Sequence, residues 1–165
     1  MHELLLLLLT TCPATLAERD GFTVCYDSQN QRALWAKHEV KPSTTSSQRK
    51  HWRKDHELNS LSASAFTKTG FDRGHLAAAA DLPGSEDTFL TSNAIAQDPA
   101  LNRSHWRRLE NQIRKHGPAT VITGAIYAHC GNEKIQAPCY IFKIARFESG
   151  EVLAALYYNA SKIAH

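Results

Sequence analysis

Two stretches of the sequence place an acid, a base and an amide where they could do chemistry together. The first, Asp72-Arg73-Gly74-His75, puts four different functional types side by side. The second, residues 101–110, has the periodicity of a helix. At about 100° per residue, Asn102 and Glu110 fall on or beside its apolar stripe, which consists of Trp106, Leu109 and Ile113. An apolar stripe is ordinary core, but an amide and a carboxylate beside it need partners or a ligand.

These residue types suit the hydrolysis of a phosphodiester. The reaction needs a base that activates water, positive charge beside the pentacovalent phosphorus, and help for the leaving oxygen. The imidazole of His75 suits the first task, because its ordinary pKa lies near neutrality. A hard cation such as Mg²⁺ suits the other two, with the amide oxygen of Asn102 as its ligand and Glu110 holding its waters. Arg73 could bind the phosphate through two parallel hydrogen bonds.

Taken in order along the chain, several short blocks resemble the DNA/RNA non-specific endonucleases. These ββα-metal enzymes include mitochondrial endonuclease G and secreted bacterial nucleases. The blocks are Asp72-Arg73-Gly74-His75, Thr91-Ser92-Asn93 with Gln97, Leu101-Asn102, Trp106 and Leu109-Glu110. The resemblance covers roughly residues 20–159.

The resemblance implies an α+β domain with a central antiparallel sheet, flanking helices and a ββα-metal site. It implies a metal-dependent endonuclease that cleaves DNA and RNA with little sequence preference, using Mg²⁺ or, in its place, Mn²⁺. His75, Arg73 and Glu110 would be the catalytic residues, with His75 as the base and Arg73 on the phosphate. Asn102 would bind the metal directly, whereas Glu110 and Asn93 would act through its waters or the groups around them.

Two other functions compete with this one. A catalytically silent nucleic-acid-binding module of the same fold would be expected to have lost His75 or Asn102, and both are present. An exported structural or adhesive protein, in which Asp72 to His75 form only a turn, leaves the polar side chains of the helix unexplained. The sequence leaves open a homodimer, an inhibitor protein, and the choice between DNA and RNA.

Basic side chains near both stretches predict contacts with nucleic-acid phosphates. The run at residues 49–54 interleaves cations with Trp52, as expected for phosphate contacts and stacking on bases. A solvated basic loop is an equally simple explanation. We name Arg49, Lys50, Arg103 and Arg107 as substrate-binding residues, together with Arg73. Arg114 extends the basic rim beside Glu110.

The first 17 residues resemble an export signal. Residues 4–9 are all leucine, too short a run to span a membrane, and Ala14 to Ala17 provide small residues for cleavage. We therefore expect a signal peptide at 1–17 and a single nuclease domain at 18–165, periplasmic or secreted, with no stable membrane association. Loss of Glu3 leaves 19 basic and 15 acidic residues, a net charge of about +4 that favours a polyanion. A lipoprotein signal ending at Cys12 is a weaker alternative.

Cleavage after residue 17 would leave three cysteines. Cys130 and Cys139 bracket a glycine-containing loop between two strand-like runs, so we expect a disulfide between them in an oxidising compartment. Cys25 would then be a free, buried thiol.

Periodicity and turn residues predict the elements that carry these groups. Strands are expected at 22–27, 33–40 and 89–96, the last delivering Asn93, and three more strands of one buried sheet at 119–127, 139–146 and 152–159. Gly74 is expected to turn the backbone. A helix should start at Asp98-Pro99 and stop at Gly117.

Overall fold

Antiparallel strands form the sheet on which the rest of the chain packs. The computed structural model describes residues 11–41, 50–128 and 135–160. Six strands lie in the order β1-β2-β3-β6-β7-β8, and a separate small sheet pairs β4 with β5. Their bounds are Thr15–Arg19 (β1), Phe22–Asp27 (β2), Arg32–Val40 (β3), Asp72–His75 (β4), Ala94–Gln97 (β5), Ala119–Ile126 (β6), Tyr140–Phe147 (β7) and Val152–Tyr158 (β8). The predicted α+β class and central antiparallel sheet are confirmed.

One helix crosses a face of this sheet. It runs from α2 (Pro99–Leu101) through a π-helical turn, η4 (Asn102–Trp106), into α3 (Arg107–His116). Asp98 caps its start by accepting a hydrogen bond of 2.9 Å from a backbone N–H of the first turn. Gly117 follows its end with a φ of 136°, which favours glycine. The predicted ends are confirmed, whereas nothing in the sequence analysis anticipates the π-turn.

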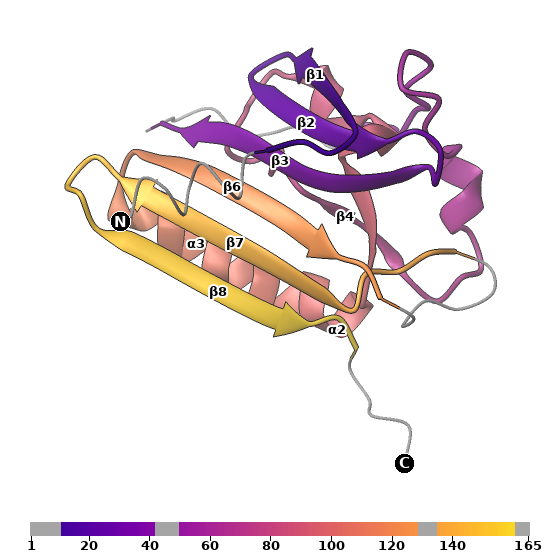
Figure 1. Ribbon diagram of the computed structural model, residues 1–165. Helices are drawn as coiled ribbons and strands as arrows, with labels where there is room; N and C mark the ends of the chain where they lie inside the picture. Colours follow the sequence, from indigo (N-terminus) through magenta and orange to yellow (C-terminus); the bar gives the residue numbers. More distant parts are fainter. Residues whose placement is uncertain (1–10, 42–49, 129–134, 161–165) are drawn as a thin grey trace.

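The hydrophobic core lies between this helix and the sheet. Trp106, Leu109 and Ile113 are buried in one cluster with Ile141 and Ala145 of β7. Figure 1 shows α3 lying behind β6, β7 and β8. Because side chains alternate along a strand, every second residue of β7 faces the helix, as the buried positions of that strand show. No helix in the described ranges is long and apolar enough to cross a bilayer.

Two of the fold predictions need correction. β8 is an edge strand rather than a fully buried one, since its alternate residues Val152, Leu156 and Tyr158 are exposed. The plural flanking helices reduce to this one helix within the described residues. The other helical pieces there are 3₁₀ turns at Ala63–Phe66, Glu86–Phe89 and Thr91–Asn93.

The small β4–β5 sheet carries the Asp-Arg-Gly-His sequence on a strand, where we had expected a turn at Gly74. Asp72 pairs with Gln97, and His75 pairs with Ala94. Glycine is needed for space: a Cβ on Gly74 would lie 2.0 Å from Oε1 of Gln97, whose side chain covers it. The strand predicted at 89–96 is also wrong in extent, because β5 begins only after Asn93, which ends a 3₁₀ turn.

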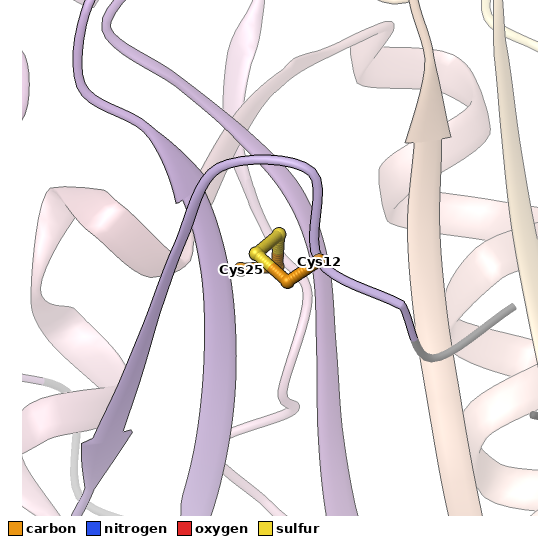
Figure 2. The surroundings of a disulfide bond; sticks show 2 residues. All are labelled: Cys12 and Cys25. Carbon is orange, nitrogen blue, oxygen red and sulfur yellow. A yellow bond between two sulfur atoms is a disulfide. The ribbon is translucent and has the colours of Figure 1, made fainter.

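A disulfide between Cys12 and Cys25 fastens the start of the domain to β2, as Figure 2 shows. Cys25 is therefore not the free thiol that we expected. Ala17 is buried in β1, which pairs with β2 along its whole length. A chain cut after Ala17 would lose most of β1 and half of this disulfide, so the predicted boundary lies inside the folded domain. A lipid on the Cys12 sulfur is equally incompatible with the disulfide.

The predicted disulfide between Cys130 and Cys139 involves a residue outside the described ranges. Cys139 is disulfide-bonded, and Cys130 lies among the residues that the structure does not describe. Their pairing stays a prediction.

Replacing Cys12 by alanine tests the anchoring of the N-terminal strand. The disulfide joins residues 13 positions apart, and closing a loop of this length stabilises a fold by about 3 kcal/mol. We expect Cys12→Ala to lower the free energy of unfolding by about that amount in urea titrations without reductant. With reductant the variant and the wild type should converge. Equal stabilities without reductant, or a free Cys25 in non-reducing peptide maps, would contradict the pairing.

Candidate active site

His75 ends β4 in an aromatic pocket. The centre of its ring lies 4.4 Å from that of Trp52 and 4.9 Å from that of Phe89. Burial, together with the positive charge of Lys143, lowers the pKa of His75 to about 4. Its Nε2 atom is buried without a hydrogen-bond partner in the described part of the chain. The ring is therefore neutral at neutral pH and keeps polar capacity for a water or a ligand.

Asp72, at the other end of β4, joins this strand to the helix. Its carboxylate accepts a hydrogen bond of 2.9 Å from Nδ2 of Asn102. It also accepts bonds of 2.8 and 2.6 Å from Nε and Nη2 of Arg103. Burial alone would raise the pKa of Asp72, but these bonds hold it below its usual value. Because the amide nitrogen of Asn102 is committed to Asp72, its Oδ1 is directed away from that carboxylate. Asp72 thus orients Asn102 and Arg103.

Asn102 opens the π-turn of the helix. A π-turn inserts extra backbone into a helix and is frequent at functional sites. The turn ends at Trp106, which is buried in the core. The wider turn therefore lets Asn102 face Asp72 while Trp106 and the residues after it keep the apolar side of α3 against the sheet.

Glu110 lies further along the helix than Asn102. It faces a buried lysine, Lys143, which was not identified from the sequence. Nζ of Lys143 lies 3.6 Å from Oε1 of Glu110, donates a 2.7 Å hydrogen bond to Oγ1 of Thr123, and sits 4.8 Å from the centre of the Trp106 ring. Lys143 occupies an inward position of β7 between Ile141 and Ala145. That register is the signal that could have revealed it: a lysine where alternation calls for an apolar residue.

A second buried charge cluster lies beside this pair. Oδ1 of Asp81 accepts a 2.6 Å hydrogen bond from Nη1 of Arg114, and its Oδ2 lies 2.8 Å from Nε2 of His38. Burial alone would raise the pKa of Asp81, but both partners lower it. Arg114, which we expected on a phosphate-facing rim, is held by this carboxylate instead.

Asn93 bonds to the backbone on both sides of its amide. Its Oδ1 accepts a hydrogen bond from the backbone N–H of Ala77, and its Nδ2 donates to the carbonyls of Ala77 and Thr88. The side chain is completely buried. Because its amide is bonded to the backbone, Asn93 fixes the chain that follows His75, and its role around a metal stays a prediction.

The predicted substrate-binding cations differ in their surroundings. Nη1 of Arg73 donates 2.9 Å to the carbonyl of Ala63, and Lys50 is paired with Glu86 at 3.3 Å on the surface. Arg103 is mostly exposed but bonded to Asp72. Arg107 is exposed and has no ion pair within the described ranges, whereas Arg49 lies outside them.

Trp52 is not the free stacking surface that the basic run suggested. Its ring packs on His75 and lies 5.4 Å from the ring of Phe89. Trp52 therefore packs around His75, the proposed base.

Oxygen donors near β4 and the helix fit a hard cation that keeps most of its waters. Asn102 offers one amide oxygen, and Gln97 is buried with neither amide atom hydrogen-bonded in the described residues. Nowhere in those ranges do three His, Cys, Asp or Glu side chains gather as a metal cage. Such a donor set suits Mg²⁺, which binds through few protein oxygens plus water and phosphate. Gln97 is in one of the sequence blocks that resemble the family. Its burial against Gly74 could not be predicted, because it depends on the pairing of β4 with β5.

The burial of a neutral His75 predicts a specific acid sensitivity. An unfolded histidine takes up a proton near pH 6.5, while the folded side chain resists until about 4. Between these values the unfolded state binds more protons, so stability falls as the pH falls from 6.5 towards 4. The free energy of unfolding should drop by up to about 3 kcal/mol more in the wild type than in His75→Phe. Parallel curves for the two proteins would contradict the buried neutral ring.

Comparisons with known proteins place the chain in a family. The profile of the DNA/RNA non-specific endonuclease family matches residues 9–163. Mitochondrial endonuclease G of Homo sapiens is 29% identical over 165 residues, which covers 82% of this chain and 56% of that protein. The bovine protein is 30% identical, with 82% and 55% covered, so the chain spans about half the length of these relatives. The nuclease of Serratia marcescens is 34% identical over 109 residues, covering 59% of this chain and 41% of that enzyme.

The fold has a solved counterpart. A chain in the crystal structure of the EndoG/EndoGI complex superimposes with a TM-score of 0.73 at 18% identity, covering 89% of this chain and 75% of that one. At this identity the likeness establishes the fold alone. The family profile covers nearly all of the sequence, and the chain therefore belongs to the DNA/RNA non-specific endonuclease family.

Proposed function

We propose that this chain is a metal-dependent endonuclease that hydrolyses DNA and RNA with little sequence preference. The observation that carries the proposal is the bond between Asp72 and Asn102. It joins the strand that ends in a neutral imidazole to the helix turn that carries an amide oxygen. A proton acceptor and an oxygen ligand thus sit on two directly connected elements. Family membership and the nuclease names of the relatives support the same reaction.

The proposed metal is Mg²⁺, with Mn²⁺ as a substitute. Oδ1 of Asn102 would hold it directly, and Glu110 would hold its waters. When bound, the ion would supply positive charge beside the phosphorus and the leaving oxygen. The fit rests on the donor set, which offers amide oxygens but no cluster of carboxylates or imidazoles in the described residues.

The roles of the protein's own catalytic groups follow from their surroundings. His75 is neutral, so it can accept a proton from the attacking water. Arg73 is held at one nitrogen by the carbonyl of Ala63, which leaves the rest of its planar fork for a phosphate oxygen. Glu110 is mostly buried beside Lys143, so its carboxylate is held in place rather than moving freely in solvent.

The partners and the compartment are part of the proposal. Nucleic acid is the substrate, and an inhibitor protein is a reasonable partner because the structural neighbour was solved in the EndoG/EndoGI complex, described as a mechanism of EndoG inhibition. Dimerisation of this chain stays open. We propose export to an oxidising compartment, where the bond between Cys12 and Cys25 can form. Any leader would then be cut before Cys12 rather than after Ala17.

Separate roles for His75 and Asn102 predict different responses to added metal. His75→Ala should lower kcat by about 10²- to 10⁴-fold, the usual loss for a general base, at every Mg²⁺ concentration. Asn102→Ala should weaken the metal site, so that activity partly returns as Mg²⁺ rises. The measurement is DNA hydrolysis across a Mg²⁺ titration, with Mn²⁺ as a second series. If added metal restores His75→Ala as readily as Asn102→Ala, the assigned base belongs to the metal site.

Arg107 and Arg108 offer a matched test of phosphate binding. Both are exposed neighbours on α3, but at about 100° per residue Arg107 lies about 60° from Glu110 and Arg108 about 160°. If Arg107 contacts a phosphate, Arg107→Ala should flatten the dependence of log affinity for duplex DNA on log salt by about 0.9. Arg108→Ala should leave that slope unchanged. Equal changes in both variants would mean that only net charge matters.

A further inference from the structure

We propose that Lys143 is a positioning residue that fixes the carboxylate of Glu110. The proposal rests on the proposed function, in which Glu110 holds the waters of the metal. It assigns a task to a strand residue that lies outside the Asp-Arg-Gly-His sequence and outside the helix.

A buried lysine at this position requires an explanation. Lys143 is 1% exposed and lies in the inward row of β7 with Ile141 and Ala145. Moving an ammonium group out of water costs several kcal/mol, which a partner must offset. An apolar residue of similar size would fill the same space without that cost. Burial holds the pKa of Lys143 below its usual value although the carboxylates of Glu110 and Asp81 oppose the shift, and burial likewise raises the pKa of Glu110 against the pull of Lys143.

The ammonium group is held from three sides, which gives its charge a defined position. Thr123 on β6 accepts its hydrogen bond at 2.7 Å. The face of the Trp106 ring lies 4.8 Å away, within the range of a cation–π contact. Glu110 takes the third side at 3.6 Å. A carboxylate that is 15% exposed is thereby drawn towards a fixed cation instead of turning to solvent.

The neighbouring charges leave Glu110 as the natural partner of this cation. Asp81 also acts on Lys143, but it already binds Arg114 and His38 within 2.8 Å. The charge of Lys143 also disfavours the protonated imidazole of His75. The charge of Lys143 thus acts on both Glu110 and His75. A single buried cation therefore connects the proposed metal-side carboxylate with the proposed base.

A double-mutant cycle on the full chain tests this role. Lys143→Gln removes the charge but keeps a donor for Thr123, and Lys143→Met removes both. Each is combined with Glu110→Gln. The double variants therefore contain no buried Glu110 charge without its lysine partner, which protects them against unfolding. kcat and KM are measured per folded protein at saturating Mg²⁺ with one DNA substrate. Lys37→Gln, on an exposed position of β3, is the control.

We expect Lys143→Gln and Glu110→Gln each to lower kcat by about tenfold or more, with KM within about twofold of the wild type. The double variant should be no slower than Glu110→Gln, because Lys143 acts through that carboxylate. Losses that multiply in the double variant, or a Lys143→Gln enzyme with wild-type kcat, would overturn this role and leave the proposed function standing. An inactive wild type would overturn both.

Discussion

The hydrogen bonds of Asp72 hold together the two elements on which the site depends. One carboxylate binds the amide of Asn102 and the guanidinium of Arg103. Both donors come from the π-turn, while Asp72 itself starts the strand that ends at His75. β4 and β5 belong to a sheet of only two strands, which is marginal by itself in water. The contact with the helix thus fixes a strand pair that its own hydrogen bonds would hold weakly.

Several charged side chains lie in the interior beneath the helix. Glu110 and Arg114 extend from α3 towards Lys143 and Asp81, with His38 behind them. Every charge in this layer has an opposite charge within 4 Å, as buried charges require. The layer fixes the side of the helix that carries Glu110, and it places positive charge where a protonated His75 would be disfavoured. Packing and electrostatics therefore position the same groups.

The helix ends and the strands could be predicted from the sequence because they depend on local signals. Asp98 and Gly117 mark the helix ends because capping and left-handed backbone depend on single residues. Strand alternation places β2, β3, β6 and β7 to within a residue or two. The family blocks predict His75, Asn102 and Glu110 as site residues because those residues are close in sequence to distinctive neighbours. Lys143 could have been found by the same alternation that places its strand.

The failures all involve contacts between segments far apart in the chain. The small residues before Ala17 read equally well as a cleavage region and as a strand, and only pairing with β2 decides between them. Gly74 suggests a turn in the sequence alone, because only the structure places the side chain of Gln97 over it. A π-turn depends on how the helix fits Asp72, which local propensity does not encode.

Anomalous scattering from a crystal soaked in Mn²⁺ distinguishes a separate base and metal ligand from a shared one. We expect one strong peak about 2.1 Å from Oδ1 of Asn102, the distance expected for a small hard cation. The imidazole of His75 should not coordinate the ion, and Asp72 should keep its bond to Nδ2 of Asn102. A peak bonded to a nitrogen of His75 would contradict the account, because a histidine that holds the metal cannot also serve as the base.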